Sequence, residues 1–221
     1  LELTWRAVND IHFPASMERA EAARRRFKFE ELFLFQLLSQ ILRKEIDRSR
    51  APKIAFAEDE TKQFVGRLPF RLTDDQRRAA WEILQDMGRE RPMNRLLEGE
   101  VGSGKTLVAA IASLNAVKAG QQVAYMAPTE ILALQHFKTF SDLLAPKGIT
   151  VAIFTAGRKQ IFGDPPVSGK KPEAAFLQAI RQGMTDVVIG THALIEEQVV
   201  FEHLGLAVVD EQHRFGVRHR Q

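Results

Sequence analysis

The chain has 221 residues, of which 45% are hydrophobic and 27% charged, and its formal net charge of +3 does not by itself indicate a nucleic-acid partner. No apolar run is long enough to cross a bilayer, which argues against a membrane protein. The absence of cysteine excludes disulfides and thiolate metal sites, and it fits a cytoplasmic protein.

The first long element is a predicted helix from about residue 16 to 48. Ser16 is a suitable N-cap, and neither Gly nor Pro follows it before Pro52. The second half of the helix carries Phe and Leu at i, i+3, i+4 and i+7 spacing, so we expect an apolar face that packs on another part of the protein. We therefore expect a helical linker segment over residues 1–50 and an irregular connector over 51–69.

From residue 70 onward, predicted helices alternate with apolar strands. Thr73 precedes a predicted helix over 74–87, and Thr129 precedes another that continues to residue 144. The predicted strands show almost no apolar–polar alternation, and they cover residues 94–98, 122–126, 150–154, 186–190 and 206–210. Such strands between helices indicate an α/β domain with a parallel sheet covered by helices on both faces. The segment 157–172 is a predicted loop.

A phosphate-binding motif follows the predicted strand at 94–98. Residues 99–106 match the pattern G-x-x-x-x-G-K-[ST]. In such a loop, backbone N–H groups point at the α- and β-phosphates, the lysine reaches the β- and γ-phosphates, and the final hydroxyl binds Mg²⁺. The following apolar helix gives the strand–loop–helix order that the motif needs. The sequence therefore predicts a site for ATP or GTP at Gly99, Glu100, Val101, Gly102, Ser103, Gly104, Lys105 and Thr106.

A pair of carboxylates ends the last apolar strand. In P-loop enzymes, an aspartate in the position of Asp210 holds Mg²⁺, and an adjacent residue such as Glu211 polarises the attacking water. The carboxyl ends of parallel strands meet at one rim of a sheet, where ligands bind. We therefore expect Lys105 and Glu211 to be catalytic, and Thr106 and Asp210 to be Mg²⁺ ligands.

The P-loop, followed by Asp210-Glu211-Gln212-His213, resembles the superfamily 2 nucleic-acid helicases. Longer strings resemble the RecG family of bacterial DNA helicases over nearly the whole chain, and they lie at residues 11–14, 27–32, 68–76, 126–133, 190–194 and 210–217. The resemblance implies a RecA-like P-loop lobe, preceded by a helical linker, that uses ATP and Mg²⁺. It implies a DNA helicase that remodels branched DNA, including forks and Holliday junctions, in recombination and repair.

The resemblance also implies roles for single residues. Gln76 matches the glutamine that recognises adenine, Phe70 matches the aromatic residue before it, and His213 matches the residue that couples the ATP and DNA sites. DNA contacts are implied at Pro128, Thr129, Gly190, Thr191 and His192. The chain departs from the family at residues 155–157, where Thr-Ala-Gly replaces Thr-Gly-Ser.

Three alternatives stay open: a transcription-repair coupling translocase, a nucleotide-binding module without turnover, and a small-molecule kinase. Only 11 residues follow Asp210, so we expect a first motor lobe over 70–221 that is incomplete at its C-terminal end. The family's second motor lobe and wedge domain are the expected partners besides DNA, in a monomer with no membrane association. Without the second lobe's arginine, we expect the isolated chain to hydrolyse ATP hardly at all.

Overall fold

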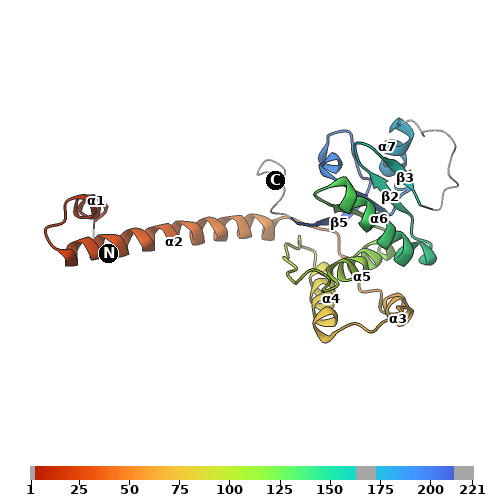
Figure 1. The fold of residues 1–221 in the computed structure, drawn as a ribbon, viewed down its shortest axis with the longest axis horizontal. Helices are drawn as coiled ribbons and strands as arrows, with labels where there is room; N and C mark the ends of the chain where they lie inside the picture. Colours follow the sequence, from red (N-terminus) through yellow and green to blue (C-terminus); the bar gives the residue numbers. More distant parts are fainter. Residues whose placement is uncertain (1–2, 163–172, 212–221) are drawn as a thin grey trace. The chain divides into compact units, whose positions relative to one another are not determined.

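The computed structural model describes residues 3–162 and 173–211 of the chain. It divides into two compact units, Leu1–Arg50 and Ala51–Gln221 (Figure 1). Among the helices of the described ranges, none is long and apolar enough to cross a membrane. His213 and most of the predicted 157–172 loop lie outside the described residues.

The first unit is a pair of helices, α1 (Thr4–His12) and α2 (Met17–Arg48). The Ser16 hydroxyl accepts a hydrogen bond from the Arg19 N–H at 3.3 Å, so the predicted helix and its cap are confirmed. Helix α1 was not predicted, and it packs against the first part of α2. From residue 29 to 42, α2 carries large apolar side chains on more than one side of the helix, and they are exposed, namely Phe29, Leu32, Phe33, Leu34, Phe35, Leu37, Leu38, Ile41 and Leu42.

The second unit is built on a five-stranded sheet with the order β3-β2-β4-β1-β5. The strands are β1 (Gln122–Met126), β2 (Val151–Phe154), β3 (Lys159–Ile161), β4 (Val187–Gly190) and β5 (Leu204–Val209). The helices are α3 (Glu58–Gly66), α4 (Asp74–Met87), α5 (Lys105–Lys118), α6 (Glu130–Leu144) and α7 (Glu173–Arg181), with short 3₁₀ turns η1 (Ala145–Lys147) and η2 (His192–Ile195). Neighbouring strands in β2-β4-β1-β5 are parallel, and only β3 is antiparallel, to β2. The prediction of a mainly parallel α/β fold is confirmed.

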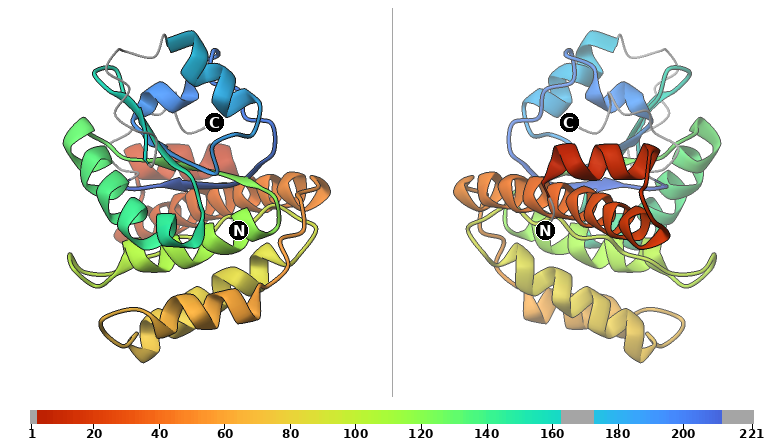
Figure 2. Two further views of the ribbon diagram at one scale, coloured as in Figure 1. Left: turned by 90° about the vertical axis from the view of Figure 1, so that its right-hand side faces the viewer. Right: turned by 90° about the vertical axis from the view of Figure 1, so that its left-hand side faces the viewer.

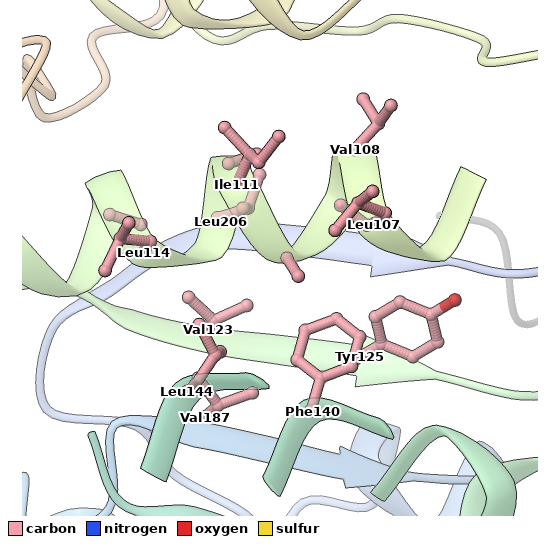
Figure 3. Packing of buried hydrophobic residues seen from close by; sticks show 14 of the residues in the cluster. Leu107, Val108, Ile111, Leu114, Val123, Tyr125, Phe140, Leu144, Val187 and Leu206 are labelled. Atoms are coloured by element: carbon pink, nitrogen blue, oxygen red, sulfur yellow. The ribbon is translucent and has the colours of Figure 1, made fainter. Parts of the chain in front are cut away.

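Helices cover both faces of the sheet. On one face, α5 and α6 pack on side chains such as Val123 and Tyr125 of β1 and Val187 of β4 (Figure 3). Helices α3 and α4 pack on the outer side of α5, so that α5 lies between them and the sheet (Figure 2). On the other face, α7 contributes Phe176, whose ring stacks on Phe154 with centroids 5.7 Å apart.

The predicted strand at 94–98 is wrong. The segment has no regular secondary structure, and the Leu96 side chain is 72% exposed. Arg95 ties the segment to α4 instead, because its guanidinium donates to Asp86 at 2.9 Å and to Glu82 at 2.8 Å. A strand needs a neighbouring strand for its backbone groups, and no described strand pairs with this segment.

Other expectations also needed correction. The 51–69 connector is not irregular throughout, because it contains α3, whose Phe64 is buried in the main core. The start of the predicted 157–172 loop forms β3. Strand β5 is not covered on both faces, and Leu204 and Val209 are each 44% exposed, because β5 is the edge strand of the described sheet.

Gln122 ties together the amino-terminal edge of the sheet. Its buried side-chain amide donates to the Ile180 and Thr185 carbonyls at 3.0 and 2.9 Å. Its oxygen accepts from the N–H groups of Glu202 and His203 at 2.8 and 3.2 Å. Four backbone groups from two chain segments thus depend on one side chain.

We predict that Gln122→Leu lowers the free energy of unfolding by about 2–4 kcal/mol, because buried polar groups lose their partners at about 1–3 kcal/mol each. The measurement is urea unfolding followed by circular dichroism. The control is Gln182→Leu at an exposed position, which should change stability by less than about 0.5 kcal/mol. Equal effects of the two substitutions would contradict the prediction.

Candidate nucleotide and nucleic-acid site

The loop at residues 99–106 leads directly into α5, which begins at Lys105. Gly102 and Gly104 have φ values of +83° and +86°, in the left-handed region that glycine tolerates best. The Ser103 N–H donates to the Glu100 carbonyl at 3.1 Å and closes the turn. A helix amino terminus that follows such a turn presents free N–H groups and the positive end of its dipole, which suits a phosphate.

Two side chains bond to the carbonyls of this loop. Lys105 Nζ donates to the Gly99 and Glu100 carbonyls at 2.6 and 2.9 Å. Gln76 Nε2 donates to the Ser103 carbonyl at 2.8 Å, while Gln76 Oε1 accepts from the Thr73 N–H at 2.9 Å. Gln76 is therefore part of the capping box of α4 and also a direct contact of the P-loop.

Asp210 follows β5, and its N–H donates to the Met126 carbonyl at 2.8 Å, which continues the β1–β5 pairing beyond the strand. Its Oδ2 lies 2.9 Å from Nε2 of His136 on α6. The hydrogen bond with His136 is the main cause that lowers the pKa of Asp210 below its ordinary value. Burial raises this pKa. It is lowered further by the charge of His136, by the hydrogen bond from the Glu211 N–H and by the charge of Lys105. The P-loop lysine thus acts electrostatically on Asp210.

Tyr125 of β1 lies between the two halves of the site. Burial, followed by the charge of Asp210, raises its pKa above the ordinary tyrosine value, and the Thr106 side chain near its hydroxyl opposes this. Its ring centroid lies 4.7 Å from that of His136. Tyr125 therefore packs on the histidine that bonds to Asp210.

This donor set fits Mg²⁺. Within residues 3–162 and 173–211, no cluster of three or more His, Asp or Glu side chains could hold a metal ion by itself. Mg²⁺ in nucleotide sites is usually bound through one or two carboxylates together with substrate phosphates. Asp210 and the Thr106 hydroxyl, beside a phosphate-binding loop, match that requirement.

Glu211 has φ +50°, the only positive φ at a non-glycine residue in the described chain. Such a conformation is uncommon for a residue with a side chain and often marks a functional position. The Glu211 N–H also bonds to the Asp210 carboxylate, so the two predicted acidic residues are adjacent in space as well as in sequence. Phe70, the other residue predicted near the base, is 55% exposed.

The residues predicted to contact DNA follow β1 and β4 at the same rim of the sheet. The Ala127 N–H donates to the Gly190 carbonyl at 2.8 Å, which joins the two loops. The Thr129 hydroxyl accepts from the Leu132 N–H at 3.3 Å and caps α6, and Pro128 lies just before it. Thr191 is buried, whereas His192 is exposed at the start of η2.

Gly190 has a packing reason of its own. A Cβ there would collide with the Phe154 carbonyl and would lie 2.8 Å from Leu194 Cγ. The loop after β2 is tied inward, because the Thr155 hydroxyl donates to Glu130 Oε1 at 2.8 Å. Thr155, the first residue of the segment 155–157 that departs from the family pattern, thus bonds to another side chain of the protein.

Sequence reasoning did not identify His136 or Tyr125. Each lies on a predicted element, but a lone His on a helix and a Tyr in a strand have no motif of their own. The only available signal was that both elements begin or end at the rim where Asp210 was expected.

The mainly parallel sheet, the P-loop at the amino terminus of α5 and the strand-end Asp210 define a RecA-like nucleotide-binding domain. The DEAD/DEAH box helicase family matches residues 73–221, and the chain belongs to this family. Family membership implies the use of a nucleotide.

More specifically, the chain is similar to RecG. It is 45% identical over 212 residues to the ATP-dependent DNA helicase RecG of Aquifex aeolicus, covering 96% of this chain and 26% of that protein. It is 42% identical over 218 residues to RecG of Bacillus subtilis, covering 98% and 30%. The chain therefore spans less than a third of the length of these relatives.

Solved structures agree with this assignment. A structure of RecG bound to a three-way DNA junction matches with a TM-score of 0.80 and 42% identity, over 95% of this chain and 27% of that one. The UvsW helicase of bacteriophage T4 matches with a TM-score of 0.52 and 16% identity, over 76% of this chain and 55% of that one, which shows the shared fold alone.

We predict that Gly104→Ala weakens nucleotide binding more than Gly102→Ala does. Both positions have positive φ, but a Cβ at 104 would also collide with Gln76 Nε2, whereas nothing lies within 4 Å of a Cβ at 102. The measurement is the Kd of a fluorescent ATP analogue, and we expect a rise of more than about tenfold for Gly104→Ala, or about 1.4 kcal/mol.

The role of Gln76 is tested in the same experiment. Gly104→Ala should cost less affinity in a Gln76→Ala background than in the unchanged chain, because the colliding amide is absent there. Equal affinities of the two glycine variants would show that backbone strain alone explains the loss.

Proposed function

We propose that this chain is the ATP-binding lobe of an ATP-dependent DNA helicase that remodels branched DNA. The observation that carries the proposal is the convergence of Lys105, Thr106 and Asp210 at the amino end of α5, in a chain 40–45% identical to RecG helicases. The RecG structure bound to a three-way junction supports branched DNA as the substrate.

Phosphate binding proceeds by exchange. Lys105 Nζ already has two carbonyl partners, so on nucleotide binding it would turn from Gly99 and Glu100 to the β- and γ-phosphates. Mg²⁺, held by Thr106 and Asp210, supplies neutralisation of phosphate charge when bound. Glu211 would accept a proton from the water that attacks the γ-phosphate.

Adenine recognition is assigned to Gln76, with Phe70 beside the base. The Gln76 amide donates to the Ser103 carbonyl, so a shift of this side chain toward a base would break a hydrogen bond to the P-loop. This arrangement favours ATP over a nucleotide whose base cannot bond to Gln76.

DNA contact is assigned to two segments at the same rim of the sheet. The first is Pro128 and Thr129, after β1. The second is Gly190, at the end of β4, with Thr191 and His192 after it. The amino end of α6 and the neighbouring backbone N–H groups suit a DNA phosphate. His213, just beyond the described residues, is assigned to coupling between this rim and the ATP site.

We predict that Lys105→Ala abolishes nucleotide binding by the 221-residue chain at concentrations that saturate the unchanged protein, because the loop loses its phosphate-directed cation. The measurement is fluorescent-ATP titration, with Lys138→Ala on the exposed side of α6 as the charge-matched control. Normal binding by Lys105→Ala would refute the nucleotide site.

We predict that Glu211→Gln keeps ATP affinity within about threefold but lowers turnover by about 10²–10⁴, because it removes proton transfer in the transition state. Turnover and fork unwinding are to be measured in a chimera in which this chain replaces the matching segment of Aquifex aeolicus RecG. Glu197→Gln, at an exposed position, is the control. A chimera that hydrolyses ATP without unwinding forks would contradict the helicase assignment.

A further inference from the structure

His136 is held where two elements meet the rim of the sheet. It lies in the second turn of α6, and its side chain is only 12% exposed. Its Nε2 lies 2.9 Å from Asp210 Oδ2, and its ring lies against Tyr125, with centroids 4.7 Å apart. The ring of Phe140, one turn further along α6, also packs on Tyr125, with ring centroids 5.1 Å apart.

The bond to His136 adds a side-chain restraint on the Asp210 carboxylate, which also bonds to the N–H of the adjacent Glu211. Asp210 is the residue that follows β5, the edge strand of the described sheet, and its side chain is 24% exposed. The sheet fixes its backbone through the Met126 carbonyl, but it does not fix the rotation of the carboxylate. Among the described residues, His136 is the side chain that bonds to this carboxylate.

The same rings extend to the second predicted Mg²⁺ ligand. The Tyr125 hydroxyl lies near the Thr106 side chain, and His136, which packs on Tyr125, bonds to Asp210. Groups that bond to a metal-ligating side chain orient it, and their loss typically lowers metal affinity about 10–100-fold.

We propose that His136 is a positioning residue that holds the Asp210 carboxylate ready for Mg²⁺, with its own ring supported by Tyr125. The proposal rests on the nucleotide site proposed above. It assigns His136 no contact with nucleotide and no proton transfer.

The test is a Mg²⁺ titration of fluorescent-ATP binding by the 221-residue chain. For His136→Leu we expect the Mg²⁺ concentration at half-saturation to rise about tenfold or more, while affinity without Mg²⁺ stays unchanged. His136→Gln can place an amide N–H near the position of Nε2 and should restore most of the Mg²⁺ response. The control is His203→Leu. His203 is an exposed histidine just before β5, at the opposite end of this strand from Asp210.

A second comparison separates positioning from packing. His136→Asn is polar like His136→Gln but too short to reach Asp210, so it should need more Mg²⁺ than the Gln variant even if His136→Leu does not fold. In an Asp210→Asn background, the choice of residue at 136 should no longer affect the Mg²⁺ response.

Three results would overturn the proposal: an unchanged Mg²⁺ requirement in His136→Leu, equal losses with and without Mg²⁺, or equal behaviour of the Gln and Asn variants. Failure of the unchanged chain to bind nucleotide at all would refute the proposed function instead.

Discussion

The parallel pairing of β1 with β4 on one side and β5 on the other is the constraint on which the site depends. Because the three strands run in the same direction, their carboxyl ends deliver Pro128, Thr191 and Asp210 to one rim. The hydrogen bonds from Asp210 to Met126 and from Ala127 to Gly190 continue the pairing past the strand ends. Pro128 is thereby placed at the same rim as Thr191 and Asp210, which follow it by 63 and 82 positions in the sequence.

Helix α5 fixes the other half of the site. Residues 107–116 are all buried between the sheet and the α3–α4 layer, so the amino end of this helix cannot move without disturbing the core. The P-loop is therefore a short turn attached to a helix that is buried in the core. Lys105 and Gln76 donate hydrogen bonds to the P-loop carbonyls in this structure.

Much of this architecture could be predicted because local signals decided it. Thr73 and Thr129 cap the helices they were expected to cap, and the apolar runs at 122–126 and 186–190 became buried parallel strands. The segment 94–98 was mispredicted, because a short apolar run becomes a strand only if another strand lies beside it. The roles of His136 and Tyr125 depend on how α6 docks on β1, and that is not encoded by either segment alone. The Gln76 bond to Ser103 likewise depends on tertiary packing, since 27 residues separate the two.

The apolar second half of α2 affects how the first unit can exist by itself. Phe29 and Leu38 are nine residues apart in α2, so they lie on opposite sides of the helix, and packing on one neighbouring helix cannot bury both. A polypeptide consisting of residues 1–50 alone would expose these hydrophobic side chains to water. It would be expected to self-associate or precipitate once proteolysis had separated it from the second unit.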